Sequence, residues 1–203
     1  ANSYNFPALK DGRVIKRLVK NEVPAGNQAF IFNVRRPQLS DRRVREAIDL
    51  AMDFEWINKT LFFGTYARNN SFFTNTEFAA NDVPKGAELA LLEPFRAELP
   101  PELFTQAYVP SMTDGSGNPR EQLKKADALL TAAGWVVKDG KRVNEKTGAP
   151  LTLEFMIRQD SMLRVISPMR KNLERLGIFA TIRPVDDEQY VKLSLIHISE
   201  PTR

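Results

Sequence analysis

Apolar residues recur in two stretches near the start of the chain, residues 13–23 and 27–34, and alternation with polar residues is best seen at Phe30, Phe32 and Val34. Alternation with a period of two is typical of β-strands, and the turn-forming residues Pro24, Ala25 and Gly26 lie between the two stretches. The pattern therefore predicts two strands, either as a hairpin or as neighbours in one sheet.

From residue 40 the apolar spacing becomes that of a helix. Ser40 or Asp41 can cap its first turn, and Asp53 is expected to begin a second helix that ends at Gly64. Five residues share the apolar face of the first helix: Val44, Ala47, Ile48, Ala51 and Met52.

Two long stretches, residues 65–85 and 99–119, show little periodicity and are predicted to be extended loops. Between them, residues 86–98 read as a short helix. Because long ordered loops often carry binding residues, these stretches are candidates for function.

The second half of the chain predicts alternating strands and helices. A helix from Pro119 is stopped by Gly134, and a hairpin turns at Asp139 and Gly140. A strand (151–157), a helix (161–176) and a strand (178–185) then follow, and such a unit favours parallel strands joined by a right-handed crossover. The sequence is therefore expected to form an α/β fold.

Composition adds limits to this picture. With 203 residues and 42% hydrophobic content, the chain can bury one domain core, or one domain plus a piece of another. The 29 basic and 25 acidic residues are dispersed, which argues against a dedicated nucleic-acid binder. The absence of cysteine excludes disulfides, thiolate metal sites and cysteine nucleophiles, and no apolar run approaches the length of a membrane span.

Carboxylates, serines, lysines and tyrosine are the remaining options for catalysis, but no pair of carboxylates is convincing. Asp186 and Asp187 precede a helix-like segment and are predicted to cap it, while Glu46 and Asp49 are surrounded by arginines and are predicted to form surface ion pairs. We therefore predict no enzyme activity, no catalytic residue, no metal site and no cofactor. A carboxylate-dependent hydrolase remains the alternative.

A second alternative is a basic nucleic-acid-binding module. It would use four arginines, and no stacking aromatic residues accompany them. The interpretation that we favour is that they flank a strand-to-helix corner and pair with nearby acids. The four are Arg35, Arg36, Arg42 and Arg43.

Aromatic residues are densest between residues 62 and 78. Phe62 and Phe63 are predicted to be core residues, whereas Phe72 and Phe73 lie in the polar loop and can face a ligand. Trp56 and Trp135 are both predicted to be core residues. Polar donors lie beside the loop rings, and this mixture is typical of a small-molecule or peptide cleft. These polar neighbours are Tyr66, Arg68, Asn70 and Ser71.

The last residues, 193–203, resemble one translated reading frame of a transposon-derived sequencing adapter. We therefore expect residues 193–203 to be non-native and residues 1–192 to be part of a longer protein. His197, the single histidine, is accordingly excluded from any site.

The stretch from Phe30 to Phe73 resembles the family 5 extracellular solute-binding proteins of bacterial ABC importers, the peptide-binding type. Their pattern is a strand ending in Asn, a proline, the motif D-x-R-V-R-x-A-I-x-x-A-x-D, and a helix closing at Gly. Neighbouring stretches are similar to the Yej-type subgroup, associated with oligopeptide and microcin C uptake, so that the resemblance covers residues 1–192. The motif matches are Asn33, Pro37, Asp41, Arg43, Val44, Arg45, Ala47, Ile48, Ala51, Asp53 and Gly64.

This resemblance implies a two-lobed clamshell, a type II periplasmic binding protein, of which residues 1–192 supply an incomplete carboxy-terminal α/β lobe. It implies capture of oligopeptides or peptide conjugates in the periplasm and delivery to an ABC permease, by a monomer that binds no nucleic acid. A signal peptide is expected to lie outside this fragment. The residues expected to line the ligand cleft are Asn33, Tyr66, Arg68, Asn70, Ser71 and Phe72.

Overall fold

A computed structural model describes residues 6–17, 19, 23, 24 and 26–197, with side chains as far as Leu193. The chain divides into two compact units. The loop unit comprises Ala1–Ala29 and Ala67–Pro110, and the core unit comprises Phe30–Tyr66 and Ser111–Arg203.

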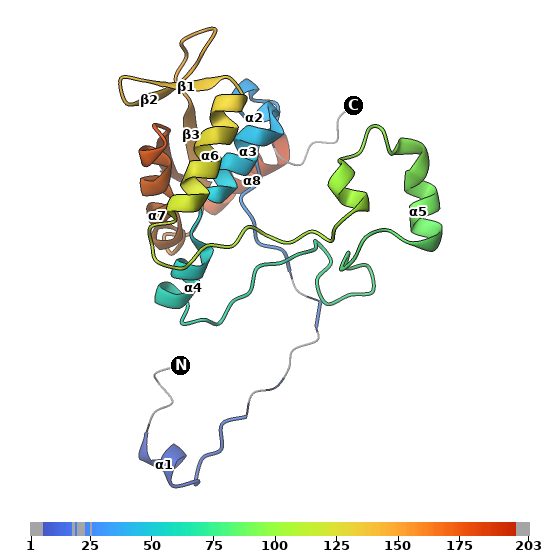
Figure 1. Cartoon of the computed structure of the whole chain (residues 1–203). Coiled ribbons are helices and arrows are strands. Elements are labelled where there is room, and N and C mark those ends of the chain that lie inside the picture. Colours follow the sequence, from blue (N-terminus) through green and yellow to red (C-terminus); the bar gives the residue numbers. More distant parts are fainter. Residues whose placement is uncertain (1–5, 18, 20–22, 25, 198–203) are drawn as a thin grey trace. The chain divides into compact units, whose positions relative to one another are not determined.

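The core unit is a mixed α/β structure (Figure 1). Strands β3 and β4 pair in parallel, with Phe155 opposite Ile182, and α7 connects them as the sequence predicts. Strands β1 and β2 form the predicted antiparallel hairpin. The elements of this unit are α2 (Pro37–Ser40), α3 (Arg42–Leu50), α4 (Phe54–Leu61), α6 (Arg120–Ala132), β1 (Trp135–Lys138), β2 (Lys141–Asn144), β3 (Thr152–Ile157), α7 (Met162–Arg175), β4 (Phe179–Pro184) and α8 (Asp187–His197).

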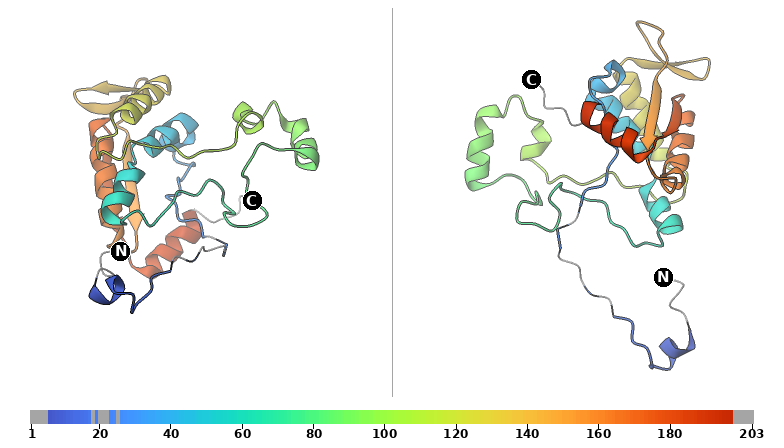
Figure 2. Two further views of the ribbon diagram at one scale, coloured as in Figure 1. Left: turned by 60° about the horizontal axis from the view of Figure 1, so that its bottom comes forward. Right: turned by 180° about the vertical axis from the view of Figure 1, so that it is seen from behind.

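The core lies among α3, α6, α7 and the β3–β4 pair, seen from behind in Figure 2. Helix α3 packs against α6, and α7 packs against β4. The buried Asn172 of α7 donates from Nδ2 to the carbonyl of Ala51 at 3.0 Å, which ties α7 to the end of α3. Residues at the centre of this core include Val44, Ala47, Ile48, Leu130, Leu151, Ile166 and Leu173.

The predicted helix starts in the core unit are confirmed. The Asp41 carboxylate accepts from the Arg43 backbone N–H at 2.8 Å, and Asp53 accepts from the Trp56 N–H at 3.0 Å. At the end of the core unit the Asp186 carboxylate accepts from the Gln189 N–H at 2.8 Å, so this acid caps α8. Side-chain acceptors at these positions satisfy donors that have no partner inside the helix.

The prediction of strands over residues 13–23 and 27–34 is wrong for the part of those stretches that the structure describes. Residues 13–17 and 26–33 contain no strand, while residues 18, 20–22 and 25 lie outside the described part of the chain. Alternation marks a segment that suits one face of a sheet, but a strand also needs a partner backbone. Phe30 uses its apolar side chain differently, packing edge-on against Phe155 with 5.5 Å between ring centroids.

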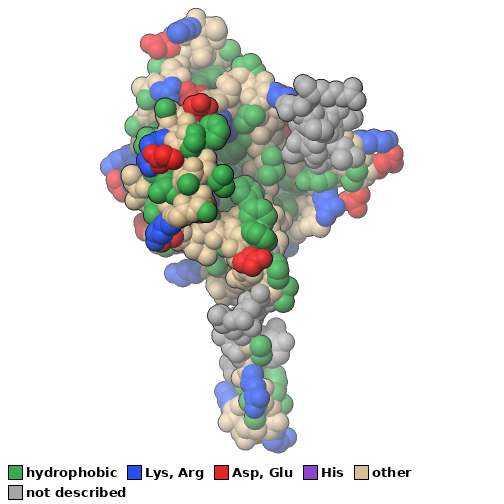
Figure 3. All heavy atoms as spheres, turned by 90° about the vertical axis from the view of Figure 1, so that its right-hand side faces the viewer, with side chains coloured by type: hydrophobic (Ala, Val, Ile, Leu, Met, Phe, Trp, Pro, Cys, Tyr) green, Lys and Arg blue, Asp and Glu red, His purple; other side chains and the backbone are tan. Residues whose placement is uncertain are grey.

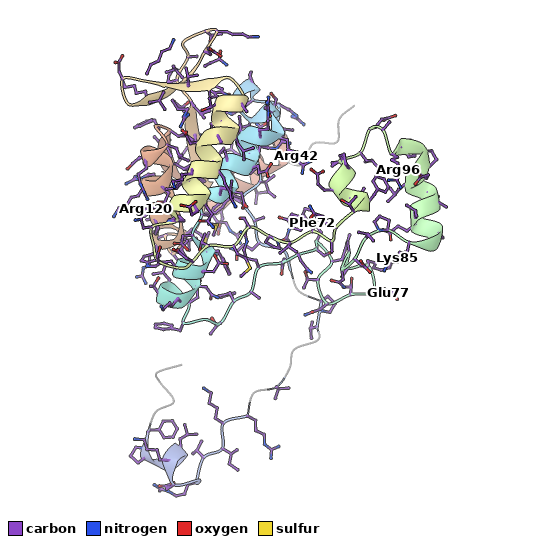
Figure 4. The ribbon with its side chains drawn as sticks, viewed as in Figure 1. Arg42, Phe72, Glu77, Lys85, Arg96 and Arg120 are labelled. Carbon is purple, nitrogen blue, oxygen red and sulfur yellow. The ribbon has the colours of Figure 1, made fainter. Side chains whose placement is uncertain are left out.

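The loop unit has short helices and long irregular segments, as predicted for residues 65–119. The Arg96 guanidinium lies 3.9 Å from the centroid of the Phe104 ring and pairs with Glu93 (Figure 4). Among the described residues of this unit, only Pro84 is buried. Its elements are α1 (Pro7–Lys10), α5 (Gly86–Leu92), η2 (Glu93–Phe95) and η3 (Pro101–Phe104).

Two aromatic predictions need correction. Phe63 is not a core residue, because its side chain is 62% exposed and its φ of 54° places it in the chain reversal after α4. Phe62 is half-buried. Trp135 is buried as predicted, but Trp56 is only half-buried and packs against Gly117, where a Cβ would lie 2.8 Å from Trp56 Nε1.

Helix α8 begins at Asp187 and runs to His197, so it extends past Lys192 into the segment predicted to be non-native. The boundary at Lys192 stays a prediction, and residues 198–203 lie outside the described part of the chain. None of the helices formed by the described residues combines the length and the apolar character that crossing a membrane requires.

Candidate functional site

The arginines of the D-x-R-V-R motif build a corner of the core unit. Arg43 donates to both carboxylate oxygens of Asp41 and, through Nη1, to the carbonyl of Ala132 at the end of α6, 2.7 Å away. Arg45 donates through Nη1 to the carbonyls of Leu39 and Ser40 at 2.8 and 2.7 Å. These two guanidinium groups therefore bind neighbouring parts of the fold, as the ion-pair interpretation predicts for Arg43.

The hydrogen bond from the Arg43 side chain is the main cause that lowers the pKa of the Asp41 carboxyl below its usual value. A carboxyl whose pKa is lower in the folded than in the unfolded protein stabilises the fold when it is ionised. That stabilisation is present above about pH 4, the ordinary pKa of aspartate, and is lost as the pH falls through the lowered value.

We expect Asp41→Asn to reduce the free energy of unfolding by about 1 kcal/mol at pH 7, because the charge-assisted bonds to Arg43 are weakened. The difference between wild type and variant should be the same at pH 7 and pH 5, and smaller at pH 3. Urea unfolding at pH 7, 5 and 3 measures it. A difference that stays constant over this range would contradict the assignment.

A second anchor, which the sequence patterns did not indicate, lies at the start of α4. Asp53 is 2% exposed, and its carboxylate accepts from the backbone N–H of Gly117 at 2.9 Å and from the hydroxyl of Thr113. Glu55 accepts from the Thr113 N–H at 2.9 Å and is 2.7 Å from the Thr113 hydroxyl oxygen. The two carboxylates thus hold the segment that leads into α6. The loop sequence T-D-G-S-G-N (residues 113–118) was the available signal for these bonds to Asp53 and Glu55, because backbone N–H groups outside helices and strands need other acceptors.

Asn33, the first predicted ligand residue, lies in the core unit just before α2. Its side-chain oxygen accepts from the Arg35 N–H at 3.1 Å, and its backbone carbonyl accepts from the Arg36 N–H at 3.1 Å. Asn33 therefore shapes the turn into α2, a role that suits the short side chain of asparagine.

Tyr66 is the last residue of the core unit before the chain enters the loop unit. Its side chain is 60% exposed, and its ring lies edge-on to Phe62 with 4.8 Å between centroids. An exposed ring with a fixed neighbour is available to a ligand.

The other four predicted residues lie within one short segment of the loop unit. The Ser71 hydroxyl oxygen accepts from the N–H groups of Phe73 and Ala80 at 3.1 and 3.2 Å, and so closes the loop between them. Asn70 Nδ2 lies 3.5 Å from its acceptor, Asn81 Oδ1. Arg68 is half-buried, whereas Phe72, labelled in Figure 4, is 76% exposed.

The structure thus brings Arg68, Asn70, Ser71 and Phe72 together in one loop, and places Asn33 and Tyr66 in the other unit. Ser71 and Asn33 have structural hydrogen bonds that sequence analysis did not foresee. A cleft formed by all six residues stays a prediction.

The carboxylates suggested for a hydrolase do not form a site. Glu46, Asp186 and Asp187 are exposed, and Asp49 accepts from the Ser111 hydroxyl at 2.7 Å. Within the described ranges, no group of three or more His, Cys, Asp or Glu side chains is arranged to hold a metal ion. On the face drawn in Figure 3, basic and acidic side chains are mixed, without the one-sided charge of a nucleic-acid groove.

An open depression of about 460 Å³ lies beside α6 and the end of α7. It contains none of the six predicted ligand residues. Its lining consists of Arg120, Leu123, Lys124, Asp127, Arg175 and Leu176.

Comparison with known proteins gives the relationship directly. Residues 3–196 match the profile of the bacterial extracellular solute-binding proteins, family 5. The chain is 49% identical over 189 residues to the uncharacterized protein YejA of Escherichia coli K12, covering 93% of this chain and 31% of that protein. It is 39% identical over 189 residues to the probable peptide-binding protein YejA of Agrobacterium fabrum, covering 92% of this chain and 31% of that protein.

Solved structures agree on the fold. The oligopeptide-binding protein AppA of Bacillus subtilis, in complex with a nonapeptide, matches with a TM-score of 0.53 at 18% identity, over 79% of this chain and 26% of AppA. An oligopeptide-binding protein of Thermus thermophilus, complexed with a pentapeptide, matches with a TM-score of 0.52 at 20% identity, over 76% of this chain and 21% of that protein. The α/β fold is therefore that of a type II periplasmic binding protein, of which the chain represents part of a lobe.

The chain spans about a third of the length of the curated relatives that it matches, 31% for the Escherichia coli protein. The predicted resemblance, made from the motif around α3, is confirmed by the family profile and by these relatives. The protein belongs to family 5 of the bacterial extracellular solute-binding proteins.

Proposed function

We propose that this chain is part of the substrate-binding component of a bacterial ABC importer, which captures oligopeptides or peptide conjugates in the periplasm. The observation that carries the proposal is the family match over residues 3–196. It is supported by the peptide-binding name of the Agrobacterium relative and by the peptides bound to the two structural neighbours.

The ligand contacts are proposed to come from the segment around Tyr66 and Phe72. These two side chains are 60% and 76% exposed, although hydrogen bonds hold the backbone at or beside them. Exposed rings on a fixed backbone provide apolar surface at a low cost in conformational entropy. The Arg68 guanidinium can add a two-point contact to a peptide carboxylate.

Further proposals concern the partners of the protein and the extent of its native sequence. The protein delivers its ligand to an ABC permease, acts as a monomer, binds no nucleic acid and catalyses no reaction. Residues 1–192 form the native part of the chain and belong mostly to the carboxy-terminal lobe, while residues 193–203 are non-native.

We expect the double substitution Tyr66→Ala and Arg68→Ala to weaken peptide binding by about tenfold or more, because an aromatic contact and a charge-assisted bond are both removed. The melting temperature should change little, since Tyr66 is largely exposed and the Asn58 bonds to its backbone remain. The host for this test is a chimera in which this chain replaces the 189-residue segment that it matches in the Escherichia coli relative.

Binding of a pool of random-sequence pentapeptides and nonapeptides is measured by equilibrium dialysis with mass spectrometry. Lys59→Gln, an exposed change on the neighbouring helix α4, serves as the control. If the chimera is folded and binds peptides, but the double variant binds them equally well, the assigned site is wrong. If the folded chimera retains no peptide, the proposed function is wrong.

A further inference from the structure

Asn58, on α4, bonds both backbone groups of a single residue eight positions later. Its Oδ1 accepts from the Tyr66 N–H at 3.1 Å, and its Nδ2 donates to the Tyr66 carbonyl at 2.7 Å. A primary amide has one acceptor and one donor side, and here both are used in the way that a neighbouring strand would use them. The backbone of Tyr66 is therefore fixed at two points.

The backbone carbonyl of Asn58 also stabilises the chain reversal that follows α4. It accepts from the N–H of Phe62 at 3.2 Å and from the N–H of Gly64 at 2.9 Å. Phe63 and Gly64, with φ of 54° and 73°, turn the chain back through the left-handed region. Asn58 thus closes the whole loop from the end of α4 to Tyr66.

The Tyr66 ring is also oriented. Its contact with Phe62 is edge-on, with 4.8 Å between centroids and 70° between planes, while the side chain remains 60% exposed. Aromatic pairs favour this geometry. One side of the ring is therefore supported, and the other is open to solvent.

We infer that Asn58 is a positioning residue for ligand recognition, which holds Tyr66 in its binding orientation before the ligand arrives. This inference rests on the proposed function, because it assumes that Tyr66 contacts the peptide. Asn58 itself touches no ligand in this account. It lowers the entropy cost of binding, because a side chain on a fixed backbone has less freedom left to lose.

The first test follows the two Asn58–Tyr66 hydrogen bonds in the 203-residue chain. Amide hydrogen exchange at Tyr66 should become at least about tenfold faster in Asn58→Ala, which loses the acceptor. Exchange in Asn58→Asp should lie between wild type and Asn58→Ala, because the carboxylate still accepts the Tyr66 N–H but cannot donate to the Tyr66 carbonyl. Equal exchange in wild type and Asn58→Ala would overturn the inference.

The second test follows recognition, in the chimera and with the peptide pool described above. Asn58→Ala is expected to weaken binding about two- to tenfold, the range given by the cost of ordering one side chain. The double variant Asn58→Ala/Tyr66→Ala should bind no more weakly than Tyr66→Ala alone, because Asn58 acts only through that ring. Circular dichroism establishes that every variant is folded at the temperature of the titration.

The outcomes separate this inference from the proposed function. Additive losses in the double variant would show that Asn58 acts independently of Tyr66, and would overturn the inference alone. A loss in Tyr66→Ala with none in Asn58→Ala would do the same. No loss in either variant would overturn both the inference and the assignment of Tyr66 to the ligand site.

Discussion

Asp127→Ala is expected to lower the free energy of unfolding by about 2 kcal/mol, because it leaves a buried guanidinium without its counter-charge. The cost is below that of a fully buried pair, since the Asp127 side chain is 55% exposed and water can reach its place. The Arg142 side chain is 2% exposed and pairs through Nη2 with the Asp127 carboxylate. Its other nitrogens donate to the carbonyls of Leu176 at 2.9 Å and Trp135 at 3.3 Å. Carbonyls satisfy hydrogen-bonding groups but carry no net charge, so among these partners the carboxylate alone supplies a counter-charge.

The close packing around Arg142 prevents an easy rearrangement. Its backbone N–H donates to the carbonyl of Gly177 at 2.8 Å, and a Cβ on Gly177 would lie only 2.8 Å from that nitrogen. Hairpin β1–β2, the end of α7 and helix α6 therefore meet at one buried cation. Loss of its partner carboxylate should weaken all three contacts together.

Urea unfolding at neutral pH measures this effect. Glu121→Ala is a matched control, because it removes a carboxylate from an exposed ion pair on the same helix, with Lys124, and should cost less than about 1 kcal/mol. Asp127→Asn should fall between the two, since an amide oxygen accepts a hydrogen bond without carrying charge. Equal costs for Asp127→Ala and Glu121→Ala would show that the buried cation does not need the carboxylate.

Asp53→Ala is expected to cost about 2–4 kcal/mol of unfolding free energy. The substitution removes a helix cap, worth about 1 kcal/mol, and leaves the Gly117 N–H without an acceptor. The Thr113 hydroxyl loses one of its two carboxylate partners and keeps Glu55. Asp53 is 2% exposed, so water cannot readily take its place. In the Asp53→Ala variant, the segment that leads into α6 should become more mobile.

Two readouts test the Asp53 prediction. Urea unfolding gives the free energy, and hydrogen exchange at the Gly117 amide reports on the attached segment. Asp186→Ala is the matched control, because Asp186 caps α8 at an exposed helix end and should cost only about 1 kcal/mol. If Asp53→Ala costs no more than this control, the contacts to Thr113 and Gly117 do not contribute.

Much of the α/β unit was predictable because its signals are local. The cap at Asp41, the stop at Gly134 and the hairpin turn at Asp139 and Gly140 each depend on residues within a few positions. The structure gives φ of 50° and 73° at that turn, as such a turn requires. The α3 motif was sufficient to recognise the family.

The candidate site was only partly predictable. The sequence indicated the aromatic and polar loop after Gly64, and Tyr66 and Phe72 are indeed exposed there. It did not indicate that Ser71 closes that loop, because its partner, the Ala80 N–H, lies nine residues away. The turn at Asn33 is local, since the N–H it accepts lies two residues later, and the turn preference of asparagine was the available signal. Asn58 was overlooked, since its partner lies eight residues away across a reversal.

By itself, the sequence determined the order of helices and turns in the core unit and the family to which the chain belongs, because helix caps, glycine stops and apolar periodicity act over short distances. Only the tertiary structure decided that residues 13–17 and 26–33 form no strand, that Arg142 is buried and that Phe63 is exposed. Each of these depends on a partner distant in sequence, or on the space that packing leaves. No local pattern specifies where such a partner will be.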